Sequence, residues 1–214
     1  MSHLVFLTGG TGYLGARLAA RLLARGHEVR ALVRPGSERR VAPGCRVVSG
    51  DALDHRTYAA QVSPADTLVH LVGVSHPGPT KTELFRTVDL ASAREAVVAA
   101  TGAGIRHFVY VSVAQPAPVM RAYVAARAEA EGLIRASGLN ATIVRPWYVL
   151  GPGHWWPVVL LPLYGLASLV PATRESARRL GLATVGQMIR ALVAAVEDPV
   201  HGTRVVEVPQ IRRH

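Results

Sequence analysis

Three glycines near the start of the chain have a spacing that can bind phosphate groups. Gly9, Gly12 and Gly15 follow the pattern G-x-x-G-x-x-G directly after the apolar residues 4–7. The first glycine permits a tight strand-to-helix turn, the second lets the backbone approach a pyrophosphate, and the third lets the helix lie close to the sheet. Free amides and the positive end of the helix dipole then face the phosphates. The pattern predicts a dinucleotide site at this turn.

The residues around the glycines support that prediction. Leu14, Leu18 and Leu22 follow at helical spacing, and Gly26 stands where a helix typically ends. A glycine triplet alone would be an ordinary structural turn. A strand before it and an amphipathic helix behind it are the context that a nucleotide-binding turn requires. We therefore favour nucleotide binding over a bare turn.

The length of the chain suits one domain with its own core, so residues 1–214 are expected to fold as a unit. Cys45 is the single cysteine, which rules out an intrachain disulfide and favours a reducing compartment. The first residues lead straight into a strand without the basic and apolar regions of a secretory signal. We expect a cytoplasmic protein.

The basic composition does not by itself indicate a nucleic-acid partner. The formal net charge is +10, and Lys81 is the single lysine among 24 basic residues. The arginines are scattered over expected helices and loops rather than grouped in a stripe, and no aromatic platform interleaves with a basic groove. We predict no nucleic-acid partner and no metal site, although the charge could attract an anionic cofactor.

Strands and helices are expected to alternate along most of the chain. Such alternation predicts an α/β fold with a parallel, doubly wound sheet and right-handed crossovers. After the first strand and helix, we expect strands at 28–33, 46–49, 67–72, 107–113, 140–144 and 203–208, and helices at 84–101, 120–137 and 184–197.

Residues 146–183 are expected to form a small extension on the substrate side of the sheet. The apolar run 158–170 is interrupted by Pro162 and Gly165, and its thirteen residues fall short of the roughly twenty that a membrane-spanning helix needs. We interpret 146–171 as a hydrophobic lid or substrate wall. Seating at a membrane interface through Trp155, Trp156 and Tyr164 is the less favoured alternative.

Seven short motifs occur in a characteristic order over nearly the whole chain. They are TGGTGYLG (8–15), ALVR (31–34), GD (50–51), HLVG (70–73), YVS (110–112), YVAAR (123–127) and TIVRP (142–146). Together they resemble the short-chain dehydrogenase/reductase superfamily, specifically the atypical and extended branches that include NmrA-like proteins. The resemblance implies a Rossmann-type fold that binds NAD(P).

The resemblance also implies which residues hold the cofactor. Arg34 ends the second strand, where NAD-preferring relatives carry an acidic residue, and a guanidinium there can pair with a 2′-phosphate. This favours NADP, with NAD as the alternative. Ser37, Arg39 and Arg40 could assist or could be solvated loop residues. The implied cofactor-binding residues are Gly9, Thr11, Gly12, Tyr13, Leu14, Gly15, Arg34, Asp51, Ala52, Leu71, Val72 and Gly73.

Two of these positions have competing interpretations. Asp51 would contact the adenine, or would cap the next helix, a role for which Asp54 competes. Gly73 would leave room for the ribose or nicotinamide side of the cofactor. His70 is expected to fill space within a strand rather than to act in catalysis.

The resemblance implies three catalytic residues. Ser112 would bind the substrate oxygen, Tyr123 would transfer the proton, and Arg127 stands where the superfamily has a lysine that holds the ribose and favours the phenolate. Arginine keeps the charge but cannot relay a proton. Asp89 stands where an asparagine is common. In the opposing interpretation Tyr123 only packs, and Arg127 pairs with Glu131 one turn further on.

These residues predict an oxidoreductase that transfers hydride between NADP(H) and a small hydrophobic carbonyl or hydroxyl compound. A non-catalytic NAD(P)-binding sensor or assembly protein is the alternative, motivated by Arg127 and Asp89. An epimerase or dehydratase that uses the cofactor transiently is a third candidate. The sequence leaves the substrate and the oligomeric state open.

Overall fold

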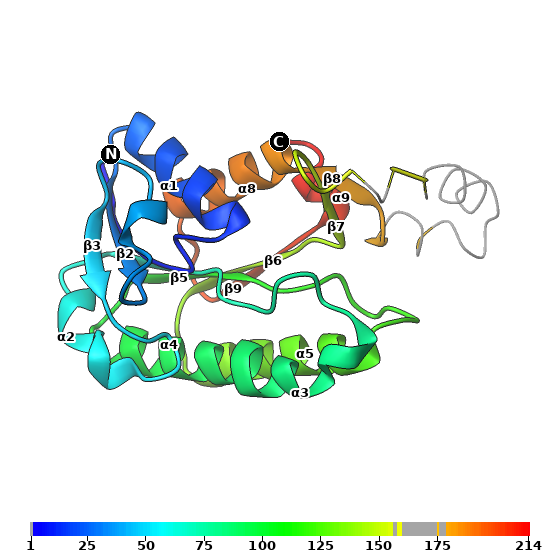
Figure 1. Ribbon diagram of the computed structural model, residues 1–214, viewed down its shortest axis with the longest axis horizontal. Coiled ribbons are helices and arrows are strands. Elements are labelled where there is room, and N and C mark those ends of the chain that lie inside the picture. The colour runs from blue at the N-terminus through cyan, green and yellow to red at the C-terminus, as the bar shows by residue number, and fades with distance from the viewer. Residues whose placement is uncertain (1, 156–157, 160–174, 176–178) are drawn as a thin grey trace.

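A parallel sheet runs through the centre of the computed structural model, which describes residues 2–155, 158–159, 175 and 179–214 (Figure 1). In this part of the chain the main sheet has seven strands in the order β3-β2-β1-β4-β5-β6-β9. The predicted doubly wound α/β fold is confirmed. The strands are β1 (Leu4–Thr8), β2 (Glu28–Val33), β3 (Arg46–Ser49), β4 (Thr67–His70), β5 (His107–Val111), β6 (Ala141–Arg145) and β9 (Thr203–Glu207).

Helices cover both faces of the sheet (Figure 1). On one face lie α1 (Tyr13–Ala24) and α8 (Val185–Glu197). The other face carries α2 (Ala59–Val62), α3 (Thr82–Leu84), the π-helical turn η4 (Phe85–Leu90), α4 (Ala91–Gly102) and α5 (Arg121–Ala136). The 3₁₀ turns η1 (Glu38–Arg40), η2 (His55–Thr57) and η3 (Pro79–Lys81) lie in connections, and α9 (Val208–Ile211) follows β9.

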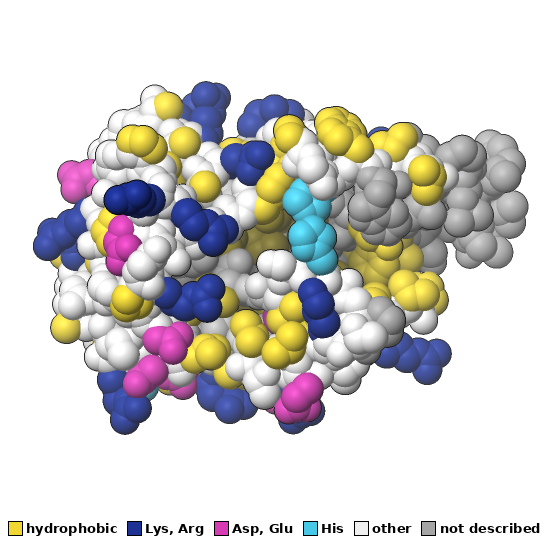
Figure 2. All heavy atoms as spheres, viewed as in Figure 1, with side chains coloured by type: hydrophobic (Ala, Val, Ile, Leu, Met, Phe, Trp, Pro, Cys, Tyr) yellow, Lys and Arg dark blue, Asp and Glu magenta, His cyan; other side chains and the backbone are white. Residues whose placement is uncertain are grey.

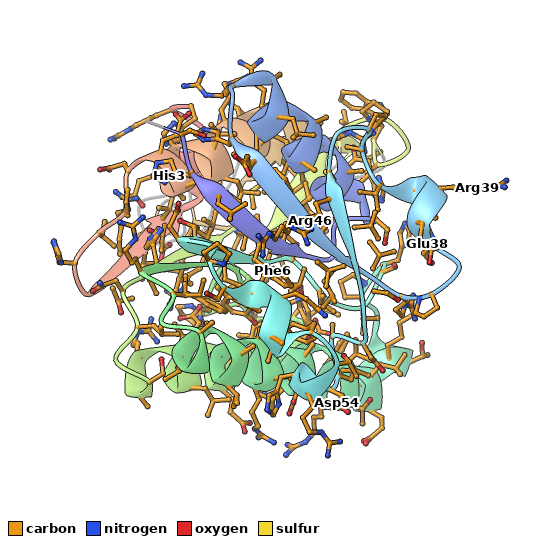
Figure 3. The ribbon with its side chains drawn as sticks, turned by 90° about the vertical axis from the view of Figure 1, so that its left-hand side faces the viewer. His3, Phe6, Glu38, Arg39, Arg46 and Asp54 are labelled. Carbon is orange, nitrogen blue, oxygen red and sulfur yellow. The ribbon has the colours of Figure 1, made fainter. Side chains whose placement is uncertain are left out.

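Alternate residues of the strands fill two separate cores. Val5 and Leu7 of β1 pack with Leu18 and Leu22 of α1, whereas Phe6 points to the opposite face and stacks on Tyr58 at 5.8 Å between ring centroids. Figure 3 shows Phe6 between the sheet and the lower helical layer. Burying one such side chain contributes about 1.5–3 kcal/mol, so both cores hold the strands in register.

Several elements differ from the sequence prediction at the edge where the strands end. β4 ends at His70 and β5 at Val111, two residues earlier than expected. The predicted helix 84–101 begins earlier and contains the π-helical turn Phe85–Leu90, a feature that is often found at functional sites. Residues 71–73 and 112–113, which follow the two strands, line cavities at this edge.

The C-terminal part contains elements that the sequence did not predict. A separate two-stranded sheet pairs β7 (Tyr148–Leu150) with β8 (Leu182–Thr184). Each strand is too short to show an alternation of apolar and polar residues, and the two lie too far apart in the sequence to suggest their pairing. The last strand ends at Glu207 instead of residue 208. Pro209 then occupies the first turn of α9, a position at which proline suits a helix.

The predicted lid lies partly outside the described residues. Residues 160–171 lie outside the described residues, so the prediction of a wall there is not tested. The membrane-seating role of Trp156 and Tyr164 is not tested for the same reason. Trp155, which is described, is exposed. Among the described residues, no helix combines the length and apolar character that crossing a membrane requires.

A buried carboxylate ties α5 to the sheet. Glu131 is fully buried and accepts hydrogen bonds from Ser112 Oγ at 2.6 Å and from Arg145 Nη2 at 2.6 Å. Arg145 also reaches Glu207 of β9 at 3.1 Å, and Arg135 pairs with Glu131 at 2.9 Å. Burial would raise the pKa of Glu131, but the hydrogen bonds from Arg145 and Ser112 outweigh it and hold the pKa below its usual value.

We expect Glu131→Gln to lower the free energy of unfolding at pH 7 by about 1–3 kcal/mol, because it removes a buried charge-assisted partner of Arg145 and Arg135, while Arg145 keeps Glu207. The carboxylate's contribution is present above its unfolded pKa of about 4.3 and is lost as the pH falls through the lower folded value. Urea unfolding at pH 7 and at a pH below the unfolded pKa measures both effects. Glu129→Gln, at an exposed position of the same helix, is the control. Equal stability of the two variants would contradict the assignment.

Candidate cofactor groove and catalytic pocket

The glycine-rich turn is pressed against the end of β4. Gly9 has φ +76°, and a Cβ atom on it would lie 2.9 Å from the carbonyl carbon of Leu71. A Cβ atom on Gly15 would collide with the carbonyl of Gly9, so the start of α1 and the turn pack backbone to backbone. The N-cap residue of α1, Gly12, makes no side-chain cap. The amides of the first turn are therefore available to an anion.

One cavity of about 350 Å³ runs from this turn toward the ends of β2 and β3. It brings together nine of the predicted cofactor-binding residues: Gly9, Thr11, Gly12, Arg34, Asp51, Ala52, Leu71, Val72 and Gly73. Leu32, Gly50, Leu53, Ser75 and Val88 also line it. Leu32 and Gly50 belong to the motifs ALVR and GD but have no predicted role, and Leu53, Ser75 and Val88 carried no sequence signal, because apolar and small residues are common everywhere. The cavity lies at the carboxyl ends of the strands, which is the edge at which open α/β sheets bind their ligands.

The structure separates the alternatives around this cavity. Asp54 caps η2, since its side chain accepts from the N–H of Arg56, whereas Asp51 lines the cavity. Arg40 also lines the cavity, with Nη2 3.5 Å from the Thr11 carbonyl oxygen. Figure 3 shows Arg39 pointing away from the molecule. Of the two loop arginines, only Arg40 faces the site.

A second cavity of about 370 Å³ adjoins the first and shares Leu71 and Gly73 with it. Together they form one groove along the carboxyl ends of the strands, and Figure 2 shows this hollow between the two helical layers. Tyr13 and Leu14, both predicted, line the second cavity. Gly15 lines neither cavity, so its role is the close packing of α1.

All three predicted catalytic residues line the second cavity, namely Ser112, Tyr123 and Arg127. Tyr123 and Arg127 lie one turn apart on α5, and the Arg127 Cζ atom is 5.3 Å from the centroid of the Tyr123 ring. Arg127 is buried, and its Nη1 donates to the Val111 carbonyl at 2.9 Å and to the Tyr110 hydroxyl at 3.2 Å. These contacts hold the guanidinium rigidly beside the phenol.

The partner of Arg127 is Asp89, not Glu131, so the alternative interpretation in which Arg127 pairs with Glu131 is wrong. Asp89 Oδ1 lies 2.6 Å from Arg127 Nη2, and the Asp89 side chain is fully buried. Asp89 Oδ2 accepts from the Val74 N–H at 3.0 Å. Burial raises the pKa of Asp89 above its usual value, although the Arg127 charge and the Val74 N–H oppose the rise. The i, i+4 spacing suggested Glu131 because spacing along one helix carries no information about contacts with residues of other elements.

Gly73 makes room for this ion pair. A Cβ atom at residue 73 would collide with the Arg127 guanidinium and would lie 3.0 Å from Asp89 Oδ1. The prediction that Gly73 leaves space for the cofactor is not tested. The Arg127–Asp89 ion pair by itself already requires a glycine at this position.

The hydroxyl proton of Ser112 is directed to a protein group. Ser112 is buried, and its Oγ donates to Glu131 Oε1 at 2.6 Å. In this arrangement Ser112 can accept a hydrogen bond from a ligand but has no proton left to donate. Tyr123 thus has the freer hydroxyl of the two.

Three neighbouring rings, which the sequence did not single out as a group, stand beside the pocket. The Tyr13 and His154 ring centroids are 4.3 Å apart, and His154 stacks on His76 at 5.1 Å with 11° between the planes. All three residues line the second cavity. His70, by contrast, is fully buried between Thr8 and Ser92, and burial lowers its pKa to about 3, so it stays neutral as a space-filling residue.

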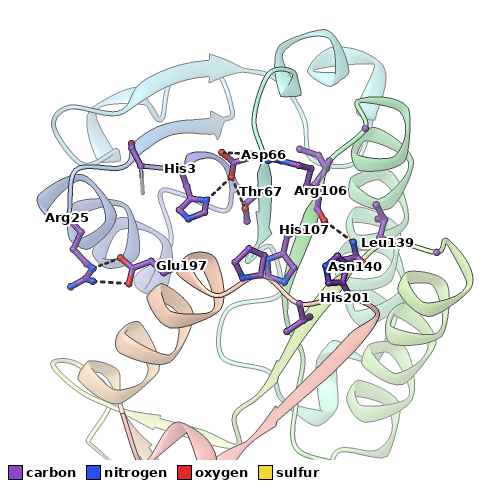
Figure 4. Close-up of a pocket in the computed structure, with 16 residues that line it drawn as sticks. His3, Arg25, Asp66, Thr67, Arg106, His107, Leu139, Asn140, Glu197 and His201 are labelled. Atoms are coloured by element: carbon purple, nitrogen blue, oxygen red, sulfur yellow. Dashed lines mark hydrogen bonds and ion pairs between the residues drawn. The ribbon is translucent and has the colours of Figure 1, made fainter.

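A larger cavity, of about 930 Å³, lies elsewhere. It opens at the edge where the strands begin, and its charged side chains pair among themselves, as Figure 4 shows for His3 with Asp66 and for Arg25 with Glu197. Ligands of open α/β sheets bind at the opposite edge, where the strands end. We therefore assign the site to the groove and not to this cavity.

One group of possible metal ligands occurs among the described residues. The ligand atoms of Asp54, His55 and Glu95 lie within 4.8 Å of one another. However, Arg56 binds both carboxylate oxygens of Asp54, and His55 donates to Glu95 at 2.6 Å. These groups already satisfy one another.

Comparison with known proteins agrees with the groove. A family model described as NAD(P)H-binding matches residues 9–152. The ceramide reductase of Caulobacter vibrioides (strain NA1000 / CB15N) is 31% identical over 98% of this chain, which spans 65% of that reductase. The 3-diazoavenalumate denitrifying reductase of Streptomyces sp is 32% identical over 92% of this chain and 73% of that protein.

The fold also has close structural counterparts. A short-chain dehydrogenase/reductase superfamily protein from Agrobacterium tumefaciens, solved with bound NAD, superposes with a TM-score of 0.68 at 18% identity, over 95% of this chain and 77% of the other. The chain belongs to the NAD(P)H-binding family within the short-chain dehydrogenase/reductase superfamily, as its motifs predicted.

We expect Gly73→Ala to destabilise the fold by about 1–3 kcal/mol, because the added methyl group forces Arg127 or Asp89 out of a packed site. Thermal and urea unfolding measure the effect. Gly78→Ala is the matched control, since Gly78 lies in the same loop with open space around its Cα atom. Equal unfolding midpoints for the two variants would show that the ion pair can move at no cost.

Proposed function

We propose that the protein is an NADP(H)-dependent reductase that acts on a hydrophobic ketone or aldehyde. The observation that carries the proposal is the position of Tyr123, whose phenol lines a pocket continuous with the dinucleotide groove and stands beside the buried cation of Arg127. A phenol at the end of such a groove is suited to exchange a proton with an oxygen that gains or loses hydride at its carbon.

In the proposed reaction Tyr123 gives its hydroxyl proton to the carbonyl oxygen, and the product is an alcohol. The bound NADPH would supply the hydride to the carbonyl carbon and leave as NADP⁺. The positive charge of Arg127 stabilises the phenolate that remains, and proton uptake from water restores the phenol. Arg127 itself keeps its proton throughout, because a guanidinium does not deprotonate in proteins.

The hydrogen-bonding capacity of Arg127 fits a role at the cofactor ribose. Its Nη1 is used by Tyr110 and Val111, and its Nη2 faces Asp89. The buried Nε has no partner. Nε and the remaining N–H of Nη2 are thus the donors that could bind ribose hydroxyls, which is the task that the superfamily gives to a lysine. Ser112 would bind the substrate oxygen only after its proton turns away from Glu131.

The remaining cofactor contacts follow from the first cavity. The amides at the start of α1 would bind the pyrophosphate, Asp51 would accept from the adenine amino group, and Arg34 would bind the 2′-phosphate. Arg40, which shares the cavity with Arg34, adds a second positive charge. This pair of arginines supports NADP over NAD.

The substrate class is inferred from the walls of the second cavity. Leu14, Leu71, Val74, Val111 and Val113 line it together with Pro146 and Trp147, and the polar side chains of Ser112, Tyr123, Arg127, Tyr13, His76 and His154 stand among these apolar ones. Such walls suit an apolar molecule with one carbonyl group. The reductase names of the relatives support the reaction class, and a reductase of ceramide is compatible with an apolar substrate. Residues 146–154 would form one side of the pocket.

A second candidate function is an NAD(P)-binding sensor or assembly subunit. It is favoured by the ion pair, because Asp89 neutralises the charge that should assist Tyr123. Such a protein would bind NADPH and turn over no carbonyl compound.

We expect Tyr123→Phe to reduce kcat by about 10²–10⁴-fold while NADPH binding is retained, because the phenol supplies the proton but not the cofactor site. Stopped-flow NADPH oxidation with a panel of apolar ketones and aldehydes measures turnover, and fluorescence titration measures binding. Tyr58→Phe is the control, since it removes a buried hydroxyl that has no partner. If wild type binds NADPH but oxidises it with no carbonyl compound, the sensor function is supported instead.

We expect Arg34→Glu to weaken NADPH binding by about 10- to 100-fold and to leave NADH binding nearly unchanged, because only the first carries a 2′-phosphate. Parallel fluorescence titrations with the two nucleotides give the ratio. Arg39→Glu makes the same charge change on the neighbouring loop but points away from the groove. A matching loss in Arg39→Glu would mean that overall charge, not Arg34, sets the preference.

A further inference from the structure

The two residues that depart from the superfamily pattern are in direct contact. Asp89 replaces an asparagine and Arg127 replaces a lysine, and they lie 38 positions apart in the sequence. In the structure Asp89 Oδ1 is 2.6 Å from Nη2 of Arg127, which lines the second cavity. Two changes that looked independent in the sequence therefore occupy one site.

Neither the Asp89 carboxylate nor the Arg127 guanidinium is stable at this buried site without the other. The Asp89 side chain is fully buried and that of Arg127 is 7% exposed. Removing one partner of such a pair leaves an unpaired charge in a medium of low dielectric, and its cost far exceeds the net value of the pair. A change at residue 89 therefore requires a matching change at residue 127.

The surroundings are shaped for this particular pair. The Val74 N–H fixes Asp89 Oδ2 at 3.0 Å, the Val111 carbonyl and the Tyr110 hydroxyl fix Arg127 Nη1, and Gly73 provides the space. The planar guanidinium of Arg127 presents N–H groups in three directions at once, toward Asp89, toward the Val111 carbonyl and toward the groove. An ammonium is a compact group on a more flexible stem and cannot hold the same three partners in a fixed fork.

We propose that Asp89 is a positioning residue that acts through Arg127, and that residues 89 and 127 function only as a matched pair, either Asp with Arg or Asn with Lys. Asp89 turns the Nη2 side of the guanidinium inward and leaves its Nε edge for the cofactor. The catalytic part of this inference rests on the proposed reductase function. The coupling between residues 89 and 127 in the free energy of unfolding does not rest on that function.

A double-mutant cycle tests the pairing. Asp89→Asn leaves Arg127 without its counter-charge, and Arg127→Lys leaves an ammonium that Asp89 holds away from the cofactor. We expect each single variant to lose at least about tenfold in NADPH affinity and in kcat/KM, and the double variant to regain at least about tenfold over either, since coupling energies between contacting residues reach this size. Urea unfolding is expected to show the same non-additivity. Arg127→Lys by itself consequently does not distinguish a sensor from an enzyme.

A pH profile gives a readout that a purely structural role would not move. In Asp89→Asn the guanidinium charge beside Tyr123 is no longer compensated, which favours the phenolate. We expect the pH–rate profile of the surviving activity to shift to lower pH in Asp89→Asn. The double variant keeps a single compact cation and is expected to lie between this variant and wild type.

The exposed pair Asp54–Arg56 provides a matched control. It has the same residue types at 2.8 Å, but the Arg56 side chain is 80% exposed. Asp54→Asn, Arg56→Lys and their combination are expected to combine additively and to leave NADPH binding unchanged, as solvated pairs do. Coupling at residues 54 and 56 as large as at 89 and 127 would overturn the inference.

The outcomes separate this inference from the proposed function. Multiplicative losses in the cycle at residues 89 and 127 would overturn the pairing, whatever the activity. If Asp89→Asn does not fold, a folded double variant supports the pairing and an unfolded one contradicts it. If wild type fails to bind NADPH, the proposed function is lost, and the unfolding cycle still decides whether the two residues form a pair.

Discussion

The contact between the glycine-rich turn and the end of β4 is the constraint on which the groove depends. Gly9 lies against the Leu71 backbone, and Gly15 lies against Gly9, so the start of α1 is brought down onto the sheet. Any side chain at these positions would lift the helix and carry its free amides away from the groove. The same contact places Leu71 and Gly73 under both cavities. The cofactor groove and the reaction pocket are therefore set by one backbone approach.

Two buried carboxylates then fix the helix that carries Tyr123. Arg127 and Glu131 lie one turn apart on α5, yet they do not pair with each other. Arg127 reaches forward to Asp89 in the helical layer, and Glu131 reaches Arg145 on β6. Each of these pairs is shielded from water, so each is costly to break and holds α5 at a defined distance from β5 and β6. The ion pairs of Arg127 and Glu131, on neighbouring turns of α5, thus together fix the position of the Tyr123 phenol.

The polarity of the groove follows from the direction of the strands. Parallel strands deliver their carboxyl ends, and the loops that follow them, to one edge, where Arg34, Asp51, Gly73 and Ser112 all lie. Arg34 and Arg40 line the first cavity, whereas many apolar side chains line the second cavity together with Tyr123. Figure 2 shows the hollow with basic side chains at its rim. A charged dinucleotide and an apolar partner would thus meet at Gly73. This division of chemistry is what the proposed reductase function requires.

The sequence by itself determined the sheet and the glycine-rich turn, and every predicted site residue except Gly15 lines the groove, because hydrophobic period, glycine spacing and strand ends are local properties. Tertiary structure alone decided the partner of Arg127, the direction of the Ser112 proton and the grouping of the Tyr13, His154 and His76 rings. It also decided that Asp54 and not Asp51 caps η2, and that Arg40 and not Arg39 faces the site. These are contacts between residues far apart in the chain or choices among equivalent neighbours, and only the packed fold makes one of them lower in energy than the others.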